Sequence, residues 1–433
     1  MMTSGIPEPG LDLLHRLRDK GIAAVVVGGA VRDMCRGRQP GDVDILADAT
    51  VETLKSLFAG QHVRVVGNTF PVCLVNDIEV APCRTPSGQF PEDDLAMRDF
   101  TVNAMAYDPL DHRLIDPFNG RTDLENRIIR FVGDPAARIM EDPVRMIRGC
   151  RFSALLSARL SESAGKALQK YGRSLVGGIP GERIRNELIK AMALPRPSVF
   201  FHCMHDTGLL AGILPSLDWC YGLDGGPFHG ETVFEHCLLV GDALPARQPL
   251  LRLAGYLHDA GKVDSQGIKD GRITFHGHET RLDALVADLD RLRFSVQEKD
   301  YILALVRCHM RPLAEKTRPK SIRRLLAMLV RHRLSFDDFM RMRIADKKGN
   351  LSKSPYTLAD IRLRVEKVRQ EMARQTAFHP DDLAISGKDI MALRHLEPGP
   401  EVGRIKQQLF EKVLDDPDLN EPETLRQMVL NME

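Results

Sequence analysis

One stretch near the N-terminus constrains the fold more than any other. The apolar run Ile22 to Val27 is rich in β-branched residues and ends in Gly28-Gly29, which predicts a buried strand followed by a tight turn. The segment Ala30 to Gly37 then has the pattern of a helix beginning directly after the glycines. Glycines there let backbone N–H groups approach a phosphate, and a helix N-terminus favours negative charge. Arg32, in the first turn of that helix, is placed to reach a phosphate oxygen.

Asp42-Val43-Asp44 follows this segment. On a strand, residues i and i+2 lie on one face, so two carboxylates there repel each other unless a cation lies between them. Divalent ions on such a pair can activate a hydroxyl and stabilise a leaving pyrophosphate. The alternative is a turn with solvated aspartates, because Gly41-Asp42 is typical of a turn. The upstream glycines favour the metal site, which needs a third carboxylate from a neighbouring strand; Glu79 is the first candidate and Asp77 the second.

The rest of the chain separates into a part with strands and a long helical part. The predicted fold class is therefore α+β, with a mixed sheet in an N-terminal head and all-α parts after it. Further strands are expected at 43–46, 62–66, 72–75 and 77–80, and helices at 11–20, 142–160, 181–194, 197–210, 358–377 and through most of 231–343. The predicted domains are a head (1–135), a neck (136–215), a body (216–350) and a tail (351–433), with only short segments expected after His379.

Composition excludes several other classes of protein. Apolar residues make up 43% and charged residues 27%, which suits a globular chain with a sizeable core. Lys+Arg number 60 and Asp+Glu 59, which argues against a uniformly basic nucleic-acid coat and against an acidic disordered chain. No apolar run approaches the roughly 20 residues of a membrane span, and the eight cysteines contain no C-x-x-C pair. We therefore expect a cytoplasmic protein that does not enter a membrane.

Five ordered motifs along the chain resemble a known family. They are similar to those of the DNA polymerase β-like nucleotidyltransferases, in the form found in class II tRNA nucleotidyltransferases (CCA- or CC-adding enzymes) and bacterial poly(A) polymerases. The motifs are Gly28 to Asp33 with Asp42 to Asp44, Arg98 to Ala104, Ile115 to Gly120, Glu141 to Arg148, and Gly387 to Ile390 with Pro398 to Pro400. The resemblance thus extends over nearly the whole chain.

The resemblance implies how the head would work. Two Mg²⁺ ions are held by carboxylates, the 3′-hydroxyl of tRNA attacks the α-phosphorus of CTP or ATP, and pyrophosphate leaves. The implied residues are Asp42, Asp44 and Glu79 for catalysis and metal, Gly28, Gly29 and Arg32 for the triphosphate, and Arg98 and Asp99 for the nucleotide and its sugar.

The motif Glu141 to Arg148 resembles the segment that the family uses as a protein template for the incoming base. Asp142 and Arg145 would share a face of one helix; an arginine donates hydrogen bonds and an aspartate accepts them, as a pairing base does. The spacing permits this role without demonstrating it, since an ordinary ion pair has the same spacing. The resemblance also makes Arg148 a triphosphate or base contact.

Two departures from the family pattern bear on the product. Many relatives carry two arginines before the aspartate of the second motif, whereas here the first position is Met97. Residues 85–95 are also shorter than the flexible loop that is associated, in the family, with the switch from C to A. The short loop is similar to that of CC-adding enzymes, which predicts that this chain adds C-C and stops. The alternative is a trimmed loop with A addition retained.

A second candidate centre lies in the helical part. His258-Asp259 ends a predicted helix over Leu251 to Leu257, and His236 lies one helix earlier. With Asp346 they form an ordered His…His-Asp…Asp set that resembles the HD phosphohydrolase superfamily. Such ligands suit Mg²⁺ or a divalent transition metal that activates water, although a lone histidine is more often a half-buried imidazole with ordinary partners. Further candidate ligands are His276, His278 and His309.

Local charge in the helical part exceeds the average. Residues 307–348 contain 13 Lys/Arg and 4 acids, an excess of +9, which suits contacts with RNA phosphates or simply a solvated helix face. Expected RNA contacts are Arg318, Lys320, Arg323 and Arg324. The remaining functional alternatives are a poly(A) polymerase, an HD phosphohydrolase acting on RNA ends, and a catalytically silent RNA-binding module.

Overall fold

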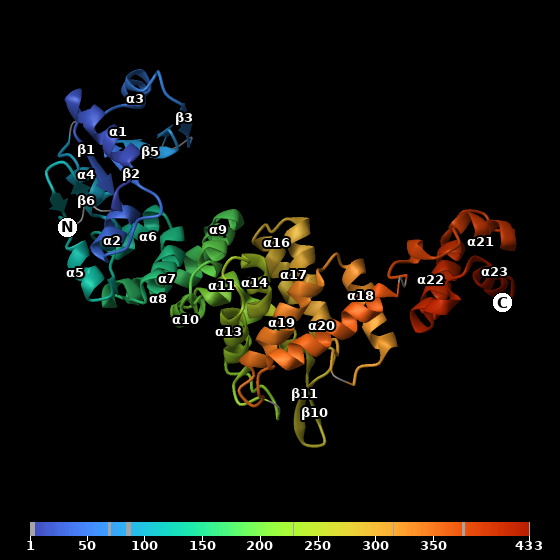
Figure 1. The fold of residues 1–433 in the computed structure, drawn as a ribbon. Coiled ribbons are helices and arrows are strands. Elements are labelled where there is room, and N and C mark those ends of the chain that lie inside the picture. The colour runs from blue at the N-terminus through green and yellow to red at the C-terminus, as the bar shows by residue number, and fades with distance from the viewer. Residues whose placement is uncertain are drawn as a thin grey trace. The chain divides into compact units, whose positions relative to one another are not determined.

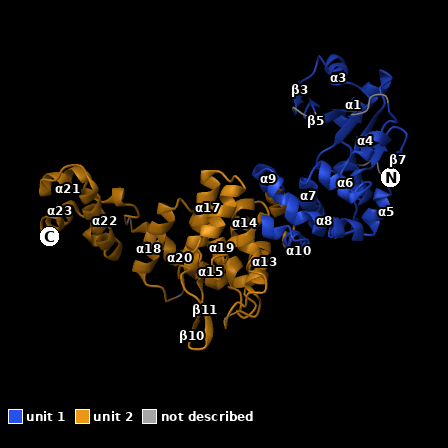
Figure 2. Cartoon of the chain, turned by 180° about the vertical axis from the view of Figure 1, so that it is seen from behind, with its two compact units in different colours: residues 1–187, 199–212 blue, residues 188–198, 213–433 orange. Residues whose placement is uncertain are grey.

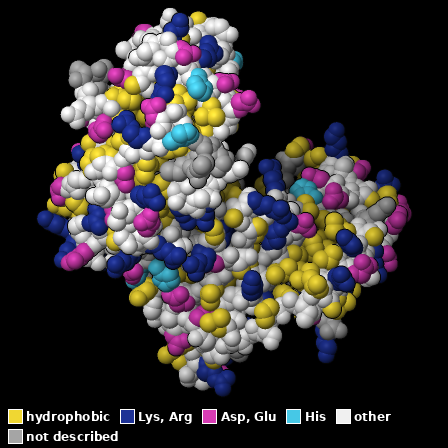
Figure 3. Space-filling view, turned by 60° about the vertical axis from the view of Figure 1, so that its left-hand side comes forward, with side chains coloured by type: hydrophobic (Ala, Val, Ile, Leu, Met, Phe, Trp, Pro, Cys, Tyr) yellow, Lys and Arg dark blue, Asp and Glu magenta, His cyan; other side chains and the backbone are white. Residues whose placement is uncertain are grey.

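The computed structural model (Figure 1) describes residues 5–67, 71–83, 88–227, 229–314, 316–374 and 377–432. The chain divides into two compact units, one of residues 1–187 and 199–212 and the other of residues 188–198 and 213–433 (Figure 2). No described helix is long and apolar enough to cross a membrane. Basic and acidic side chains are interspersed on the face drawn in Figure 3, as the net charge of +1 leads one to expect.

The first unit is built on a seven-stranded mixed sheet, which confirms the predicted α+β class. Its strand order is β3-β4-β5-β2-β1-β6-β7; β2 and β5 run parallel and the other neighbours antiparallel. The strands are β1 (Ala24–Val27), β2 (Asp44–Ala47), β3 (Val63–Val66), β4 (Val72–Val75), β5 (Ile78–Pro82), β6 (Ala106–Asp108) and β7 (Arg113–Ile115).

Both faces of the central strand β1 are covered, which explains its uninterrupted apolar sequence. Val26 packs in one core cluster with Leu14 and Leu17, while Val25 and Val27 belong to a second cluster on the opposite face. The helices of the head are α1 (Glu8–Asp19), α2 (Gly29–Cys35), α3 (Val51–Leu57), α4 (Glu92–Ala96) and α5 (Gly120–Glu125).

The helical part of the first unit corrects one expectation that matters for the site. The helix predicted over 142–160 begins only at Val144 and ends at Leu156. Asp142 is extended, with φ −155° and ψ 98°, because Pro143 disfavours helical backbone in the preceding residue. The elements here are α6 (Pro135–Glu141), α7 (Val144–Leu156), β8 (Ile128–Ile129), β9 (Arg159–Leu160), α8 (Glu162–Leu175), α9 (Gly181–Met192), α10 (Ser198–Asp206) and α11 (Leu210–Ile213).

The second unit is mainly helical, as predicted, with one exception. The helical pattern expected over 231–343 is interrupted by the hairpin of β10 (Gln266–Lys269) and β11 (Arg272–Phe275). Asp270 and Gly271 both have positive φ in its two-residue loop, and Asp-Gly is a strong hairpin signal that outweighs helical periodicity. Its helices before the tail are α12 (Pro215–Asp218), α13 (Val233–Ala243), α14 (Pro249–Leu257), α15 (Lys262–Ser265), α16 (Asp283–Arg291), α17 (Val296–Cys308), α18 (Pro319–Arg331), α19 (Phe336–Gly349) and α20 (Leu358–Ala373).

The tail has more regular structure than its glycines and prolines indicate. Its helices are α21 (Gly387–Arg394), α22 (Pro400–Asp415) and α23 (Pro422–Leu430), so the prediction of short segments only was wrong. Pro400 and Pro422 each lie in the first turn of a helix, where a missing N–H costs nothing. The apolar faces of these helices form one core, to which α18 contributes Ala327.

Candidate functional site

The acidic residues of the first unit gather where β2 begins. Asp44 is the first residue of β2 and lies opposite Glu79 of the parallel strand β5. Asp42 lies two residues earlier, in the bend before the strand rather than on it. These three residues line a pocket of about 620 Å³. Asp77 also borders the pocket, but its side chain is 85% exposed and pairs with Arg64, so the geometry favours Glu79 as the third carboxylate.

The surroundings of these carboxylates fit a divalent cation. Burial raises the pKa of Asp44, and the nearby Arg98 opposes that rise. Burial also raises the pKa of Glu79, as does the neighbouring charge of Asp44. Two carboxylates that raise each other's pKa ionise together most readily with a cation between them, and oxygen ligands are those that Mg²⁺ prefers.

The predicted glycine turn lies against this acidic group. Gly28 has φ +71°, a conformation that favours glycine. A Cβ atom there would lie 2.9 Å from Nη1 of Arg98 and 3.8 Å from Oδ2 of Asp44. The structure therefore brings together Gly28, Asp44 and Arg98 from three separate motifs. Arg98 also contacts the buried Asp94 at 3.3 Å, which holds it in place.

A buried polar chain connects the glycine helix to α7. Arg32 donates to Oδ1 of Asn103 over 2.9 Å, and the Asn103 amide donates to Asp99 over 3.1 Å. Arg148 on α7 donates to the other oxygen of Asp99 over 2.7 Å. Although burial acts against its charge, Asp99 and Glu187 raise the pKa of Arg148. The predicted nucleotide contacts Arg32, Asp99 and Arg148 thus form one network, which also fixes their side chains.

The two residues predicted to read the base do not pair with each other. Asp142 accepts two hydrogen bonds from Arg183 of α9, at 2.9 and 2.8 Å. Arg145 donates to Oε2 of Glu141 over 2.6 Å and to the carbonyl of Arg138 over 3.0 Å. The expectation of a shared helix face was wrong because Asp142 lies in the break before α7. The role of both residues in base selection stays a prediction.

The second unit contains the predicted histidine–aspartate cluster. Asp259 lies at its centre, with Oδ2 3.3 Å from Nε2 of His258 and 3.7 Å from Nε2 of His236. Nε2 of His236 is also 3.3 Å from Oδ1 of Asp346. His278 lies 3.1 Å from Oδ1 of Asp259, and His309, at 3.6 Å, joins it there. His276 is exposed and takes no part, so it is corrected from a candidate ligand to a surface residue.

The orientation of these imidazoles fits a metal site. The Nδ1 atoms of His236, His258, His278 and His309 lie 3.3, 2.8, 2.9 and 2.6 Å from backbone carbonyls, which directs every Nε2 towards the centre. Nε2 of His236 and of His258 are buried without a hydrogen-bond partner. Burial alone would raise the pKa of Asp259, but His258 and Lys262 hold it well below its usual value. A nitrogen-rich site with ionised carboxylates suits a divalent transition metal.

The expected RNA contacts divide into exposed and buried residues. Arg318 is exposed; Lys320 and Arg324, each about half exposed, pair with Asp415. Arg323 is only 4% exposed and donates to Glu371 and to the carbonyls of Leu414 and Asp415. Its assignment to RNA is corrected: α18 is amphipathic, and Arg323 lies on its buried side.

Some residues of these sites were not selected from the sequence. Asn103 stands inside the quoted motif Arg98 to Ala104, so its place was visible although its bridging role was not. Lys262, at 2.8 Å from Asp259, follows it by one helical turn, a spacing that signals a possible ion pair. Arg183 and Glu187 reach the site from α9, and no local signal in the sequence indicates this.

Family models match three stretches of the chain. They are described as the poly A polymerase head domain (residues 24–130), the probable RNA and SrmB-binding site of polymerase A (159–220) and the HD domain (229–330).

Individual relatives agree with the family models. The A-adding tRNA nucleotidyltransferase of Deinococcus radiodurans is 33% identical over 411 residues, which cover 90% of this chain and 91% of that protein. The CC-adding tRNA nucleotidyltransferase of Halalkalibacterium halodurans is 39% identical over 46% of this chain and 52% of that protein. The crystal structure of the Bacillus stearothermophilus CCA-adding enzyme in complex with CTP has the same fold, with a TM-score of 0.69 and 24% identity over 98% of both chains.

The fold and the site together define a nucleotidyltransferase head joined to an HD-type domain. The chain belongs to the tRNA nucleotidyltransferase family, and it is an enzyme of that kind. This confirms the resemblance seen in the sequence motifs.

Proposed function

We propose that this enzyme adds two cytidines from CTP to the 3′ end of tRNA without a nucleic-acid template, and then stops. The observation that carries the chemistry is the pairing of Asp44 with Glu79 across β2 and β5, beside the Gly28 turn. That arrangement puts carboxylate oxygens and a phosphate-binding backbone at one point, as transfer of a nucleotide requires. The location in the cytoplasm stays a prediction.

Each group in the head has a role in this proposal. Asp42, Asp44 and Glu79 would hold Mg²⁺, which supplies activation of the attacking hydroxyl and stabilisation of the leaving pyrophosphate. Gly28, Gly29 and Arg32 receive the triphosphate, and Arg98, Asp99 and Arg148 orient the nucleotide. The 3′-oxygen of the RNA forms a bond to the α-phosphorus, and the bond from that phosphorus to pyrophosphate breaks. Asp142 and Arg145 select the base.

The proposed C-C product rests on the connection between β5 and the second motif. Thr85, Pro86 and Ser87 of the predicted short loop lie outside the described residues. The remainder is mostly the helix α4, which buries Leu95 in the core of the head and Asp94 against Arg98. A segment packed in this way supplies little length for a mobile loop. The named relatives include both an A-adding and a CC-adding enzyme, so the product must be measured.

An extension assay tests the proposal. Purified protein is incubated with tRNA lacking its 3′ end, with tRNA ending in C and with tRNA ending in C-C, each with CTP, ATP or both. Products are resolved at one-nucleotide resolution. We expect two cytidines on the first substrate, one on the second and none on the third. Complete CCA, addition of A alone to the third substrate, or a long A tail would each overturn the C-C product, and Asp44→Ala shows whether the head is responsible.

A second activity is favoured by the buried Nε2 atoms of His236 and His258. We propose that the HD-type cluster hydrolyses a phosphoester at RNA ends, such as a 2′,3′-cyclic phosphate. His236, His258, Asp259 and Asp346 would hold a divalent metal, which supplies an activated water. Hydrolysis is measured before and after metal removal, in the wild type, in His258→Ala and in His276→Ala as the matched control. Unchanged hydrolysis in His258→Ala would exclude this centre as its source.

A further inference from the structure

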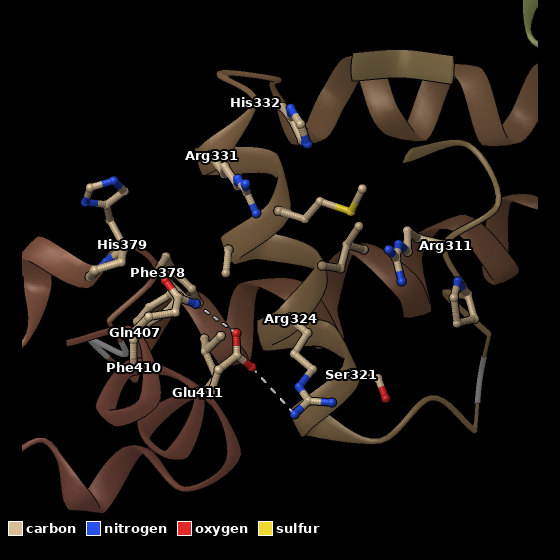
Figure 4. Close-up of a pocket in the computed structure, with 16 residues that line it drawn as sticks. Arg311, Ser321, Arg324, Arg331, His332, Phe378, His379, Gln407, Phe410 and Glu411 are labelled. Carbon is tan, nitrogen blue, oxygen red and sulfur yellow. Dashed lines mark hydrogen bonds and ion pairs between the residues drawn. The ribbon is translucent and has the colours of Figure 1, made fainter. Parts of the chain in front are cut away.

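A groove of about 1020 Å³ lies in the second unit between α18 and the tail (Figure 4). One wall is the exposed face of α18, and the other is formed by α22 with the short segment at Phe378 and His379. Neither the head site nor the histidine–aspartate cluster contributes to it.

The groove is lined by three arginines. Arg324 and Arg331 lie seven residues apart on α18, with Ser321 and Met328 on the same face at spacings of three and four. Arg311 approaches from the segment after α17, and in Figure 4 it lies on the far side of Arg324 from the tail. Glu411 is the one acid among the described residues that line the groove.

Two of these arginines have no partner within the protein. Among the described residues, none forms a hydrogen bond or ion pair with the guanidinium of Arg311 or of Arg331, and Arg311 is exposed. Arg324 is half exposed and pairs with Asp415 at 3.0 Å and with Glu411 at 3.7 Å. The adjacent Arg323, by contrast, is buried with three acceptors. The groove therefore presents guanidinium groups that the fold does not use.

The spacing of these charges suits a chain of phosphates. Seven residues of helix separate Arg324 and Arg331 by about 10 Å along the axis, which fits separate phosphates of a polymer better than one small anion. Guanidinium groups bind phosphate oxygens in a fork geometry. Phe378 and Phe410 add apolar surface beside them, against which a ribose or base can pack.

We propose that this groove binds the sugar–phosphate backbone of the tRNA substrate, away from the 3′-terminal nucleotide that the head receives. Arg311 and Arg331 each contact a phosphate, and Arg324 contacts a third after exchanging Glu411 for it. The inference rests on the proposed function, since it takes tRNA as the substrate. It moves the expected RNA contact from Arg323 to Arg311 and Arg331.

The test compares the double variant Arg311→Ala/Arg331→Ala with a control, Arg272→Ala/Arg362→Ala. The control removes two exposed arginines that do not line the groove and have no partner among the described residues. Binding of tRNA lacking its 3′ end is measured by fluorescence anisotropy over a series of salt concentrations, and extension kinetics are measured in parallel. Because all four side chains are free, melting temperatures should match that of the wild type.

The groove variant should raise KM for tRNA by about tenfold with KM for CTP and kcat unchanged. The slope of log K against log salt should become shallower by about 1.8, the contribution of two phosphate contacts. Wild-type binding and wild-type slope in the groove variant, or an equal loss in the control, would overturn the groove assignment. Failure of every protein to extend tRNA would instead refute the proposed function, while the binding slopes would still decide whether the groove holds RNA.

Discussion

Asp44 and Glu79 lie opposite each other on the parallel strands β2 and β5, although 35 positions separate them in the numbering. The pair places two half-buried carboxylates on one edge of the sheet, and burial raises the pKa of both. Nothing in the local sequence around Glu79 distinguishes it from an ordinary strand residue. Its partner across the sheet is what makes it a candidate for catalysis.

Substitutions at the third carboxylate should separate Glu79 from Asp77. Glu79→Gln keeps the size of the side chain but removes a charged metal ligand, so kcat for nucleotide addition should fall by about 100-fold or more. Asp77→Asn should remain within about twofold, because its side chain is 85% exposed and pairs only with Arg64. Single-turnover extension at saturating CTP and Mg²⁺ measures both. A larger loss in Asp77→Asn than in Glu79→Gln would reverse the assignment.

The pair of Asp142 with Arg183 should influence the choice of base. Asp142→Ala removes an acceptor for the base, and discrimination between CTP and UTP, as the ratio of kcat/KM values, should fall by about 10- to 100-fold. Arg183→Ala should lower the same ratio less, because Asp142 remains but is no longer oriented by two hydrogen bonds. In the double variant the second substitution should add nothing.

The matched control for this prediction is Arg121→Ala, which breaks an exposed ion pair with Glu125 on α5. Its selectivity should equal that of the wild type. Additive effects of Asp142→Ala and Arg183→Ala would contradict a common route through the carboxylate.

Arg323 should matter for stability rather than for RNA. It is 4% exposed and forms a buried pair with Glu371 at 2.8 Å, so Arg323→Ala should lower the free energy of unfolding of its domain by about 3–5 kcal/mol. Arg318→Ala, at an exposed position, should change it by less than about 0.5 kcal/mol. Urea unfolding followed by circular dichroism gives both values. Equal midpoints for the two variants would show that the buried pair contributes little.

Metal binding by the HD-type cluster should be visible without any activity. Adding Mn²⁺, Co²⁺ or Ni²⁺ to metal-free protein at about 100 times the dissociation constant should stabilise the folded state by about 2.7 kcal/mol. The resulting rise in melting temperature should be lost in His258→Ala, whose imidazole lies 3.3 Å from Asp259, and retained in His276→Ala, whose side chain is exposed. A rise that survives in His258→Ala would place the metal elsewhere.

Much of the head could be predicted because its signals are local. The run ending in Gly28-Gly29 became β1 and α2, and its apolar residues reflect burial on both faces of the sheet. The α+β class and the family followed from such patterns and from motifs of adjacent residues. The errors arose where two local signals competed. Pro143 overrode helical spacing at Asp142, and Asp270-Gly271 turned a region of helical pattern into a hairpin.

The sequence by itself determined the strand–glycine–helix unit, the paired aspartates, the ordered histidines and the family, because each depends on residues close together in the chain. Only the tertiary structure decided which distant groups meet. It placed Glu79 beside Asp44, gave Asp142 to Arg183, and buried Arg323 while leaving Arg311 and Arg331 without partners in a groove. The physical reason is that charge and hydrogen-bonding capacity are properties of a residue type. Which partner satisfies them is set by the packing of elements that the chain brings together from far apart.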